Sequence, residues 1–180
     1  GEGYHTHLCS RPLSGMRRYP LGRETAIQKC EWRDDGWLYL AQGGQVPSVD
    51  FLSPSGASSA TRDVPSRRHF DGSDLPAEFQ WLRTPFPDRI FSLTEAPGFL
   101  RLHGRESIGS WFEQALVARR QEHFNFRAET GLQFEPETYQ QAAGLVSYYN
   151  RHKFHFLAVT ATPATGRCLM IMSCLGDWQD

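Results

Sequence analysis

The sequence predicts an all-β protein. Aromatic residues make up 13% of its 180 residues, and they fall in short runs in which apolar and polar side chains alternate. Such alternation is typical of half-buried antiparallel strands. Turn residues separate the runs at intervals of roughly 8–12 residues, which favours a sandwich or barrel over a parallel sheet. Only residues 136–143 have a helical pattern, with Pro136 suited to a first turn and Gly144 to a stop.

Strand candidates follow one another along the chain. The first is the alternating run at residues 4–8, and a second, residues 37–40, follows the turn signal Asp34-Asp35-Gly36. Further runs alternate in the same way at residues 78–83, 99–102, 114–119, 124–130 and 132–134. Two apolar runs flank a polar turn at residues 150–153 and predict a hairpin with strands at 145–149 and 154–159. Residues 168–172 predict the strand after it.

A change in composition divides the chain. Residues 43–68 are rich in Gly, Ser and Pro, and few of them could fill a core. We therefore expect three parts: a small N-terminal piece at residues 1–42, a linker at 43–68, and a β-rich domain at 69–180. A piece of 42 residues is too short to be a stable domain alone, so we expect it to belong to a larger unit.

Composition and charge exclude several classes of protein. The net charge is −1, and the basic residues occur singly or in pairs, so a nucleic-acid partner is not expected. No apolar run is long enough to cross a bilayer, so no membrane partner is expected. The chain begins without Met and shows no signal pattern, and it ends directly after a strand-like run. We expect a piece of a longer protein, in the cytoplasm.

The four cysteines, Cys9, Cys30, Cys168 and Cys174, lack CxxC spacing. We interpret them as buried free thiols rather than as zinc ligands.

Three segments near the N-terminus carry a family resemblance. They are HLCSRPL at residues 7–13, PLGRETAIQ at 20–28 and EWRDDGW at 31–37. They resemble the last stretch of the five-bladed β-propeller of glycoside hydrolase family 43 β-xylosidases, with Ser10 where the family usually has Gly. Several runs from Phe70 to Asn150 are similar, in the same order, to the concanavalin A-like β-sandwich that follows those propellers. The resemblance implies an incomplete antiparallel sandwich preceded by the terminal strands of a propeller.

The resemblance also implies an activity. It is the inverting hydrolysis of β-xylosides or α-L-arabinofuranosides, which requires one carboxylic acid and one carboxylate on opposite faces of the sugar. In the family these carboxylates come from earlier blades, so we expect no catalytic residue in this chain. The expected partners are a xylo-oligosaccharide substrate, the missing propeller blades of the same chain, and further copies in a homo-oligomer. No cofactor is expected; calcium is possible in the family, but no ligand cluster is evident here.

One residue is the strongest candidate for sugar contact. The resemblance places Arg23 in the pocket, where a planar, permanently charged donor can bind hydroxyl groups. Glu24 is either a companion that orients Arg23 or an exposed loop charge. His7 is predicted to support the fold rather than to react. A metal pair of His5 and His7 is disfavoured, because no third ligand is evident nearby.

Two other functions remain open for the sandwich. It could bind carbohydrate by itself, as a lectin-like module, through the aromatic residues Trp81, Trp111, Phe112, Tyr148 and Tyr149. We expect most of these side chains to lie in the core, because they alternate with polar residues. Alternatively, the sandwich supports the propeller without binding sugar. The carboxylates of Glu106, Glu113 and Glu129 are interpreted as solvated charges and are given no catalytic role.

Overall fold

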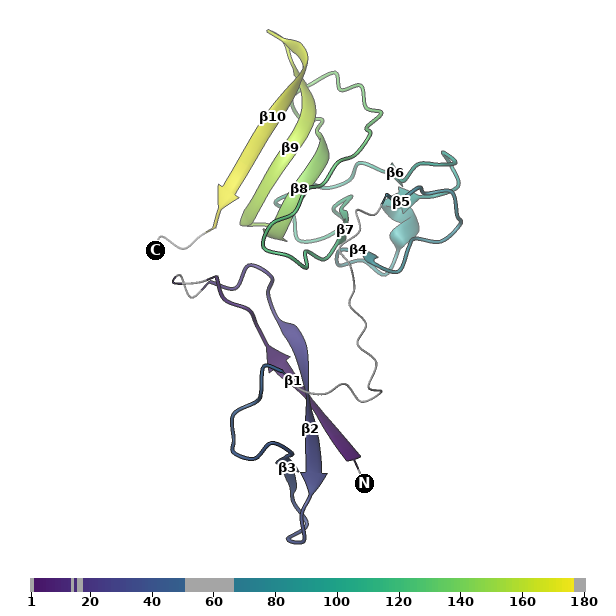
Figure 1. Ribbon diagram of the computed structural model, residues 1–180. Coiled ribbons are helices and arrows are strands. Elements are labelled where there is room, and N and C mark those ends of the chain that lie inside the picture. Colours follow the sequence, from purple (N-terminus) through teal and green to yellow (C-terminus); the bar gives the residue numbers. More distant parts are fainter. Residues whose placement is uncertain (1, 14, 16–17, 51–66, 177–180) are drawn as a thin grey trace. The chain divides into compact units, whose positions relative to one another are not determined.

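The chain forms two compact units in a computed structural model that describes residues 2–13, 15, 18–50 and 67–176 (Figure 1). The first unit comprises residues 1–67 together with Gln121–Phe124, and the second comprises the rest. The described residues contain ten strands, and their only helical element is the three-residue 3-10 turn η1 (Pro87–Arg89). The prediction of an all-β chain is confirmed.

The first unit is a three-stranded antiparallel sheet in the order β1-β2-β3. Its strands are β1 (Glu2–Cys9), β2 (Glu24–Trp32) and β3 (Leu38–Leu40), and the last confirms the strand predicted at residues 37–40. The β1–β2 register runs from Glu2 opposite Glu31 to Cys9 opposite Glu24. Because β2 is the central strand, it carries the buried side chains of the sheet, Gln28 and Cys30.

Four short strands of the second unit pair across long connections. Strand β4 (Phe79–Trp81) pairs with β7 (Val117–Arg119), and β5 (Phe91–Ser92) pairs with β6 (Arg101–Leu102). Two aromatic contacts connect these elements. The rings of Phe70 and Phe79 pack edge to face, and those of Trp81 and Phe91 pack at a tilt, with 5.6 Å between ring centroids in both pairs. Strands β4, β6 and β7 agree with three of the predicted runs but are shorter, since only two or three residues of each run find a partner strand. β5 falls in no predicted run.

The three longest strands of the second unit form one meander at its C-terminal end (Figure 1). They are β8 (Ala143–Asn150), β9 (Lys153–Thr162) and β10 (Gly166–Leu175), in the order β10-β9-β8. The predicted hairpin and the strand after it are confirmed. One face of β9 is buried through Phe154, Ala158 and Thr160, whereas the opposite face of the sheet is largely exposed.

Two strand predictions are wrong. Residues 124–130 and 132–134 form no strand, although their side chains alternate in polarity. Alternation is only half of what a strand requires, because its backbone must also find a hydrogen-bonding partner. The first of these runs is also divided between the two units: Phe124 belongs to the first unit, and the residues from Asn125 onward belong to the second. The side chains of Arg127 and Glu129 form an exposed ion pair with each other.

The predicted helix at residues 136–143 is also wrong, because other groups satisfy its backbone. The side-chain oxygen of Gln141 accepts the N–H of Glu137 at 2.6 Å. The hydroxyl of Thr160, on β9, donates to the carbonyls of Tyr139 and Gln141 at 3.3 and 2.8 Å. Residues from Ala143 onward then join β8. Tertiary contacts with β9 thus replace the local hydrogen bonds that a helix needs.

Candidate functional site

The start of β2 carries the residues for which sequence analysis predicts a role in sugar binding. Glu24 is the first residue of the strand and lies opposite Cys9, the last residue of β1. Its carboxylate accepts two hydrogen bonds from Arg11, at 2.9 Å from Nε and 2.8 Å from Nη2. Only 23% of the Glu24 side chain is exposed. Glu24 is therefore not a solvated loop charge: its carboxylate is held by an arginine from the β1–β2 connection.

The Arg11 side chain makes further contacts within the first unit. Its Nη2 also donates to the carbonyl oxygen of Glu122 at 3.0 Å, and its guanidinium carbon lies 5.8 Å from the centre of the Phe124 ring. The hydrogen bonds and charge of Glu24 raise the pKa of Arg11 above its ordinary value. A guanidinium that is always charged can hold a carboxylate in this two-bond geometry. The sequence does not single out Arg11 as a functional residue: the one indication is that it lies in the HLCSRPL segment.

Arg23 directly precedes β2 and is exposed. It follows Gly22, whose backbone lies in the left-handed region at φ 71° and whose N–H donates to the carbonyl of Tyr19 at 2.9 Å. Since Gly adopts this conformation at little cost, the sequence itself favours a tight turn just before Arg23. Arg23 thus lies on a turn just before β2, and the carboxylate of the next residue, Glu24, is bound by Arg11.

His7 lies on β1, half-buried, two residues from the exposed His5. Their rings stack with 5.9 Å between centroids and 8° between planes. Both side chains are on one face of the strand, because residues two apart in a strand point the same way. Among the residues that the structure describes, no group of three or more His, Cys, Asp or Glu side chains is placed to hold a metal ion.

The turn between β2 and β3 is organised by one carboxylate. Asp35 accepts the N–H of Trp37 at 3.0 Å and the hydroxyl of Tyr39 at 2.7 Å. These hydrogen bonds, chiefly the one from Tyr39, lower the pKa of Asp35, and the same contact raises the pKa of Tyr39. The guanidinium of Arg33 lies over the Tyr39 ring at 4.3 Å from its centre.

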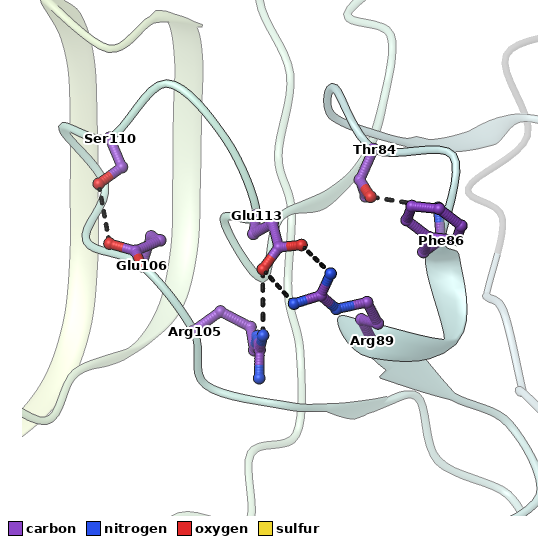
Figure 2. Close-up of polar contacts among 7 residues, drawn as sticks. All are labelled: Thr84, Phe86, Arg89, Arg105, Glu106, Ser110 and Glu113. Atoms are coloured by element: carbon purple, nitrogen blue, oxygen red, sulfur yellow. Dashed lines mark hydrogen bonds and ion pairs between the residues drawn. The ribbon is translucent and has the colours of Figure 1, made fainter.

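A second polar cluster lies in the second unit, in the loop between β6 and β7 (Figure 2). The Glu113 carboxylate pairs with two arginines. Its oxygens lie 2.7 and 2.9 Å from the two terminal nitrogens of Arg89 and 3.0 Å from Nη2 of Arg105. Its side chain is 24% exposed, and its backbone is in the left-handed region at φ 55°. The expectation that Glu113 is a solvated charge is therefore wrong, because two arginines from different segments converge on it. Glu106 is exposed and accepts a bond from Ser110 at 3.4 Å.

The next residue fixes the inside of the same loop. Gln114 is buried, and its amide nitrogen lies 2.6 and 2.7 Å from the carbonyl oxygens of Ile108 and Ser110, and 3.5 Å from that of Ser107. Its side-chain oxygen is buried without a hydrogen-bond partner. The loop thus turns around one amide group, while Glu113 pairs with Arg105 of the same loop and with Arg89 of η1.

The aromatic side chains of the second unit are more exposed than the sequence predicts. Trp81 is 39% exposed, Trp111 54%, Phe112 66% and Tyr149 64%. Trp111 is covered in part by arginine: the guanidinium carbon of Arg151 lies 3.7 Å from the centre of its ring and that of Arg83 lies 5.2 Å away. Tyr148 is half-buried and stacks on Phe154. The prediction that most of these residues lie in the core is wrong. Trp111 packs against arginine side chains at the surface, and Tyr149 lies on β8 with its side chain exposed.

All four cysteines are free thiols, as predicted. The prediction that all four are buried is wrong: only Cys30 is buried, whereas the other three lie on or at the ends of strands and are half-buried. No helix in the described part of the chain is long and apolar enough to span a membrane.

Similar proteins give this geometry its context. The chain is 51% identical over 178 residues to a xylosidase/arabinosidase of Humicola insolens, covering 99% of this chain and 32% of that protein. It is 32% identical to a non-reducing end α-L-arabinofuranosidase of Bacteroides ovatus, over 98% and 33% of the two chains. The crystal structure of a xylan β-1,4-xylosidase from Bacillus halodurans superposes with a TM-score of 0.84 at 39% identity, over 98% of this chain and 34% of that one. The chain thus spans about a third of the length of these relatives.

The fold that these comparisons define is an antiparallel β-sandwich of the concanavalin A type. Residues 67–179 match the model of the β-xylosidase C-terminal concanavalin A-like domain of glycoside hydrolase family 43. The chain belongs to that family.

Proposed function

We propose that this chain is the C-terminal part of a longer glycoside hydrolase that releases xylose or arabinose from xylo-oligosaccharides with inversion at the anomeric carbon. The observation that carries the proposal is the extent of the likeness: 96–99% of the chain matches xylosidases of three organisms at 44–51% identity. That match includes the first 66 residues, which precede the family domain. These residues are proposed to be the end of the catalytic propeller.

The chemistry of the reaction comes from outside the chain in this proposal. Inversion needs an acid and a base some way apart, with room for a water molecule between the base and the sugar. In the first unit, the carboxylates of Glu24, Glu31 and Asp35 each contact a neighbouring arginine or tyrosine. Such engaged groups suit a supporting role. The acid and the base are accordingly assigned to the preceding blades.

Arg23 is the residue of this chain that we assign to substrate binding. It is exposed on the turn before β2, and its guanidinium can donate several hydrogen bonds to the hydroxyl groups of a pentose. Glu24 and His7 are assigned to support of that site from β2 and β1. The second unit is proposed to support the propeller rather than to hold sugar.

The proposal is tested on the full-length protein with nitrophenyl β-xyloside and nitrophenyl α-L-arabinofuranoside. Hydrolysis is expected, and ¹H NMR should show α-xylose as the first product of the β-xyloside. Arg23→Ala should lower kcat/KM by about 10- to 100-fold, because hydrogen bonds from a charged donor are lost. The matched control is Arg33→Ala, which removes an exposed arginine of the same unit and should stay within about twofold.

Two results would contradict the assignment. Release of β-xylose as the first product would exclude inversion. An Arg23→Ala variant that keeps its activity within a few-fold of the parent would remove Arg23 from the site.

A further inference from the structure

The Arg11 guanidinium connects three segments of the first unit that are distant in sequence. It stands two residues beyond the end of β1, binds the first residue of β2, and also binds the segment Gln121–Phe124. It makes two hydrogen bonds to the Glu24 carboxylate and one to the Glu122 carbonyl, and it lies over the Phe124 ring.

The geometry of the Arg11–Glu24 pair fixes the carboxylate rather than merely neutralising it. Two nitrogen atoms of one planar group meet the two carboxylate oxygens at 2.9 and 2.8 Å. Such a paired contact fixes direction as well as distance. A lysine at this position would bring the same charge but could not make the two parallel bonds.

Holding Glu24 has a consequence for its neighbour. Glu24 begins β2 and a rigid, planar peptide bond joins it to Arg23, so fixing Glu24 restricts the direction in which the Arg23 side chain leaves the backbone. Arg23 itself stands on the turn that Gly22 makes with a φ of 71°. The Arg11 pair therefore restrains the C-terminal side of Arg23, and the Gly22 turn restrains its N-terminal side.

The segment at residues 121–124 adds a second fixed point. Its backbone is braced by Gln121, whose amide donates to the carbonyl of His123 at 2.8 Å. Arg11 binds the carbonyl between them, that of Glu122, with the same Nη2 that binds Glu24. A single guanidinium thus restrains both the strand that follows Arg23 and a segment that lies about a hundred residues further along the chain.

We propose that Arg11 is a positioning residue for sugar binding: through Glu24 it holds Arg23 in the orientation that contacts the substrate. The inference rests on the proposed function, since it assigns Arg11 a role in the same site. Arg11 touches neither substrate nor reacting atoms in this proposal, and acts only through Glu24.

The test uses the full-length protein and four variants: Arg11→Ala, Arg11→Lys, Arg23→Ala and Arg33→Ala. Arg33 is the matched control, because it is an exposed arginine of the same unit that pairs with a glutamate and lies over an aromatic ring. Its side chain is 50% exposed, against 52% for Arg11. The measurements are KM and kcat for nitrophenyl β-xyloside, the melting temperature, and recovery of activity on addition of guanidinium ion.

Arg11→Ala is expected to raise KM by about 10-fold or more, in the range found when a supporting partner of a functional residue is removed. Added guanidinium at millimolar concentration should restore part of this loss, since it can occupy the gap beside Glu24. Potassium ion at the same ionic strength should not. Arg11→Lys is expected to show a similar rise in KM with a melting temperature close to that of the parent, and Arg33→Ala should stay within twofold.

The outcomes separate the two proposals. If the parent protein hydrolyses the xyloside and Arg23→Ala is impaired, but both Arg11 variants stay within twofold in KM, the positioning role of Arg11 is overturned. The role is also overturned if Arg11→Lys restores the parent values, because charge alone would then suffice. A parent protein that does not hydrolyse xylosides or arabinosides would overturn the proposed function, and with it the inference.

Discussion

Single polar side chains organise the irregular parts of the chain. Asp35 binds both a backbone N–H and the Tyr39 hydroxyl and so closes the β2–β3 turn. Gln114 supplies the donor around which the β6–β7 loop turns. The Glu113 carboxylate forms ion pairs with Arg89 and Arg105, which belong to separate segments. Asp35 and Gln114 thus bind backbone groups that lie outside regular strand pairing, whereas Glu113 binds arginine side chains.

The first residue-scale prediction concerns pH. The pKa of Asp35 is lowered in the folded state, so its contacts stabilise the fold above its ordinary pKa of 3.8 and are lost as the pH falls through the lower folded value. Asp35→Asn should therefore be less stable than the parent at pH 7, and the difference should vanish in strong acid. It should also bring the pKa of Tyr39 down towards its ordinary value of 10.0.

Two measurements check this prediction. Melting temperatures between pH 2 and 7 follow the stability difference, and ultraviolet absorbance of the phenolate follows Tyr39. Identical tyrosine titrations in parent and variant would show that the Asp35–Tyr39 hydrogen bond is not formed in solution.

The second residue-scale prediction concerns the Gln114 amide. Gln114→Ala removes the donor shared by the carbonyls of Ile108 and Ser110, which would then lack this partner. Loss of such a buried partner costs about 1–3 kcal/mol of the free energy of unfolding. Denaturant unfolding of the variant measures this loss. Gln133→Ala, at an exposed position, is the control and should change stability by less than about 0.5 kcal/mol.

At the element scale, the β8–β9 pair depends on a close approach of two backbones. Gly144 lies opposite Ala158, and a Cβ added at Gly144 would stand 2.0 Å from the carbonyl oxygen of Leu157. No real Cβ contact is so short, so the strands would have to separate. The glycine is therefore required by space at this position, because its φ is not in the left-handed region.

Gly144→Ala should accordingly destabilise the second unit. The expected cost is about 1–3 kcal/mol, the range for inserting a methyl group where no room exists. The matched control is Gly131→Ala, because a Cβ there meets no atom within 4 Å and the backbone is not left-handed. Thermal unfolding of the two variants gives the comparison, and equal melting temperatures would mean that β8 and β9 are farther apart in solution.

At the scale of the whole molecule, the β8–β9–β10 sheet has one apolar face that is open in this chain. Leu169, Ile171 and Leu175 on β10 are 73%, 75% and 74% exposed, and Leu157 on β9 is 46% exposed. Cross-strand pairing puts Leu157 opposite Ile171 on that face. β10 also stands at the edge of its sheet in the described residues. A long apolar edge strand with an open face promotes association between chains.

We therefore predict that the 180-residue chain alone self-associates, and that Ile171→Lys reduces this association. A charge in the middle of the face opposes its contact with another apolar surface. Ser173→Lys is the control, since it adds the same charge on the same strand face without removing apolar surface. Size-exclusion chromatography with light scattering measures the mass. A monomeric parent chain with a cooperative melt would contradict the prediction.

Local sequence patterns are enough to predict the class of the fold and the positions of most strands. Alternating runs bounded by turn residues predicted β3, the β8–β9 hairpin and β10, because period-two patterning and turn chemistry are local properties. The same reasoning failed at residues 124–130 and 136–143. There the outcome depended on which backbone groups found a partner in the fold. In the second segment, Thr160 on β9 binds the carbonyls of Tyr139 and Gln141.

The tertiary structure alone decided how the charged residues pair. The sequence placed Arg23, Glu24 and His7 near one another, but only the fold brought Arg11 onto Glu24 and Glu122, thirteen and one hundred and eleven residues away. It likewise joined Glu113 to Arg89, twenty-four residues apart. Strand formation follows from neighbours in sequence, whereas an ion pair depends on where distant segments meet, and no local pattern records that distance.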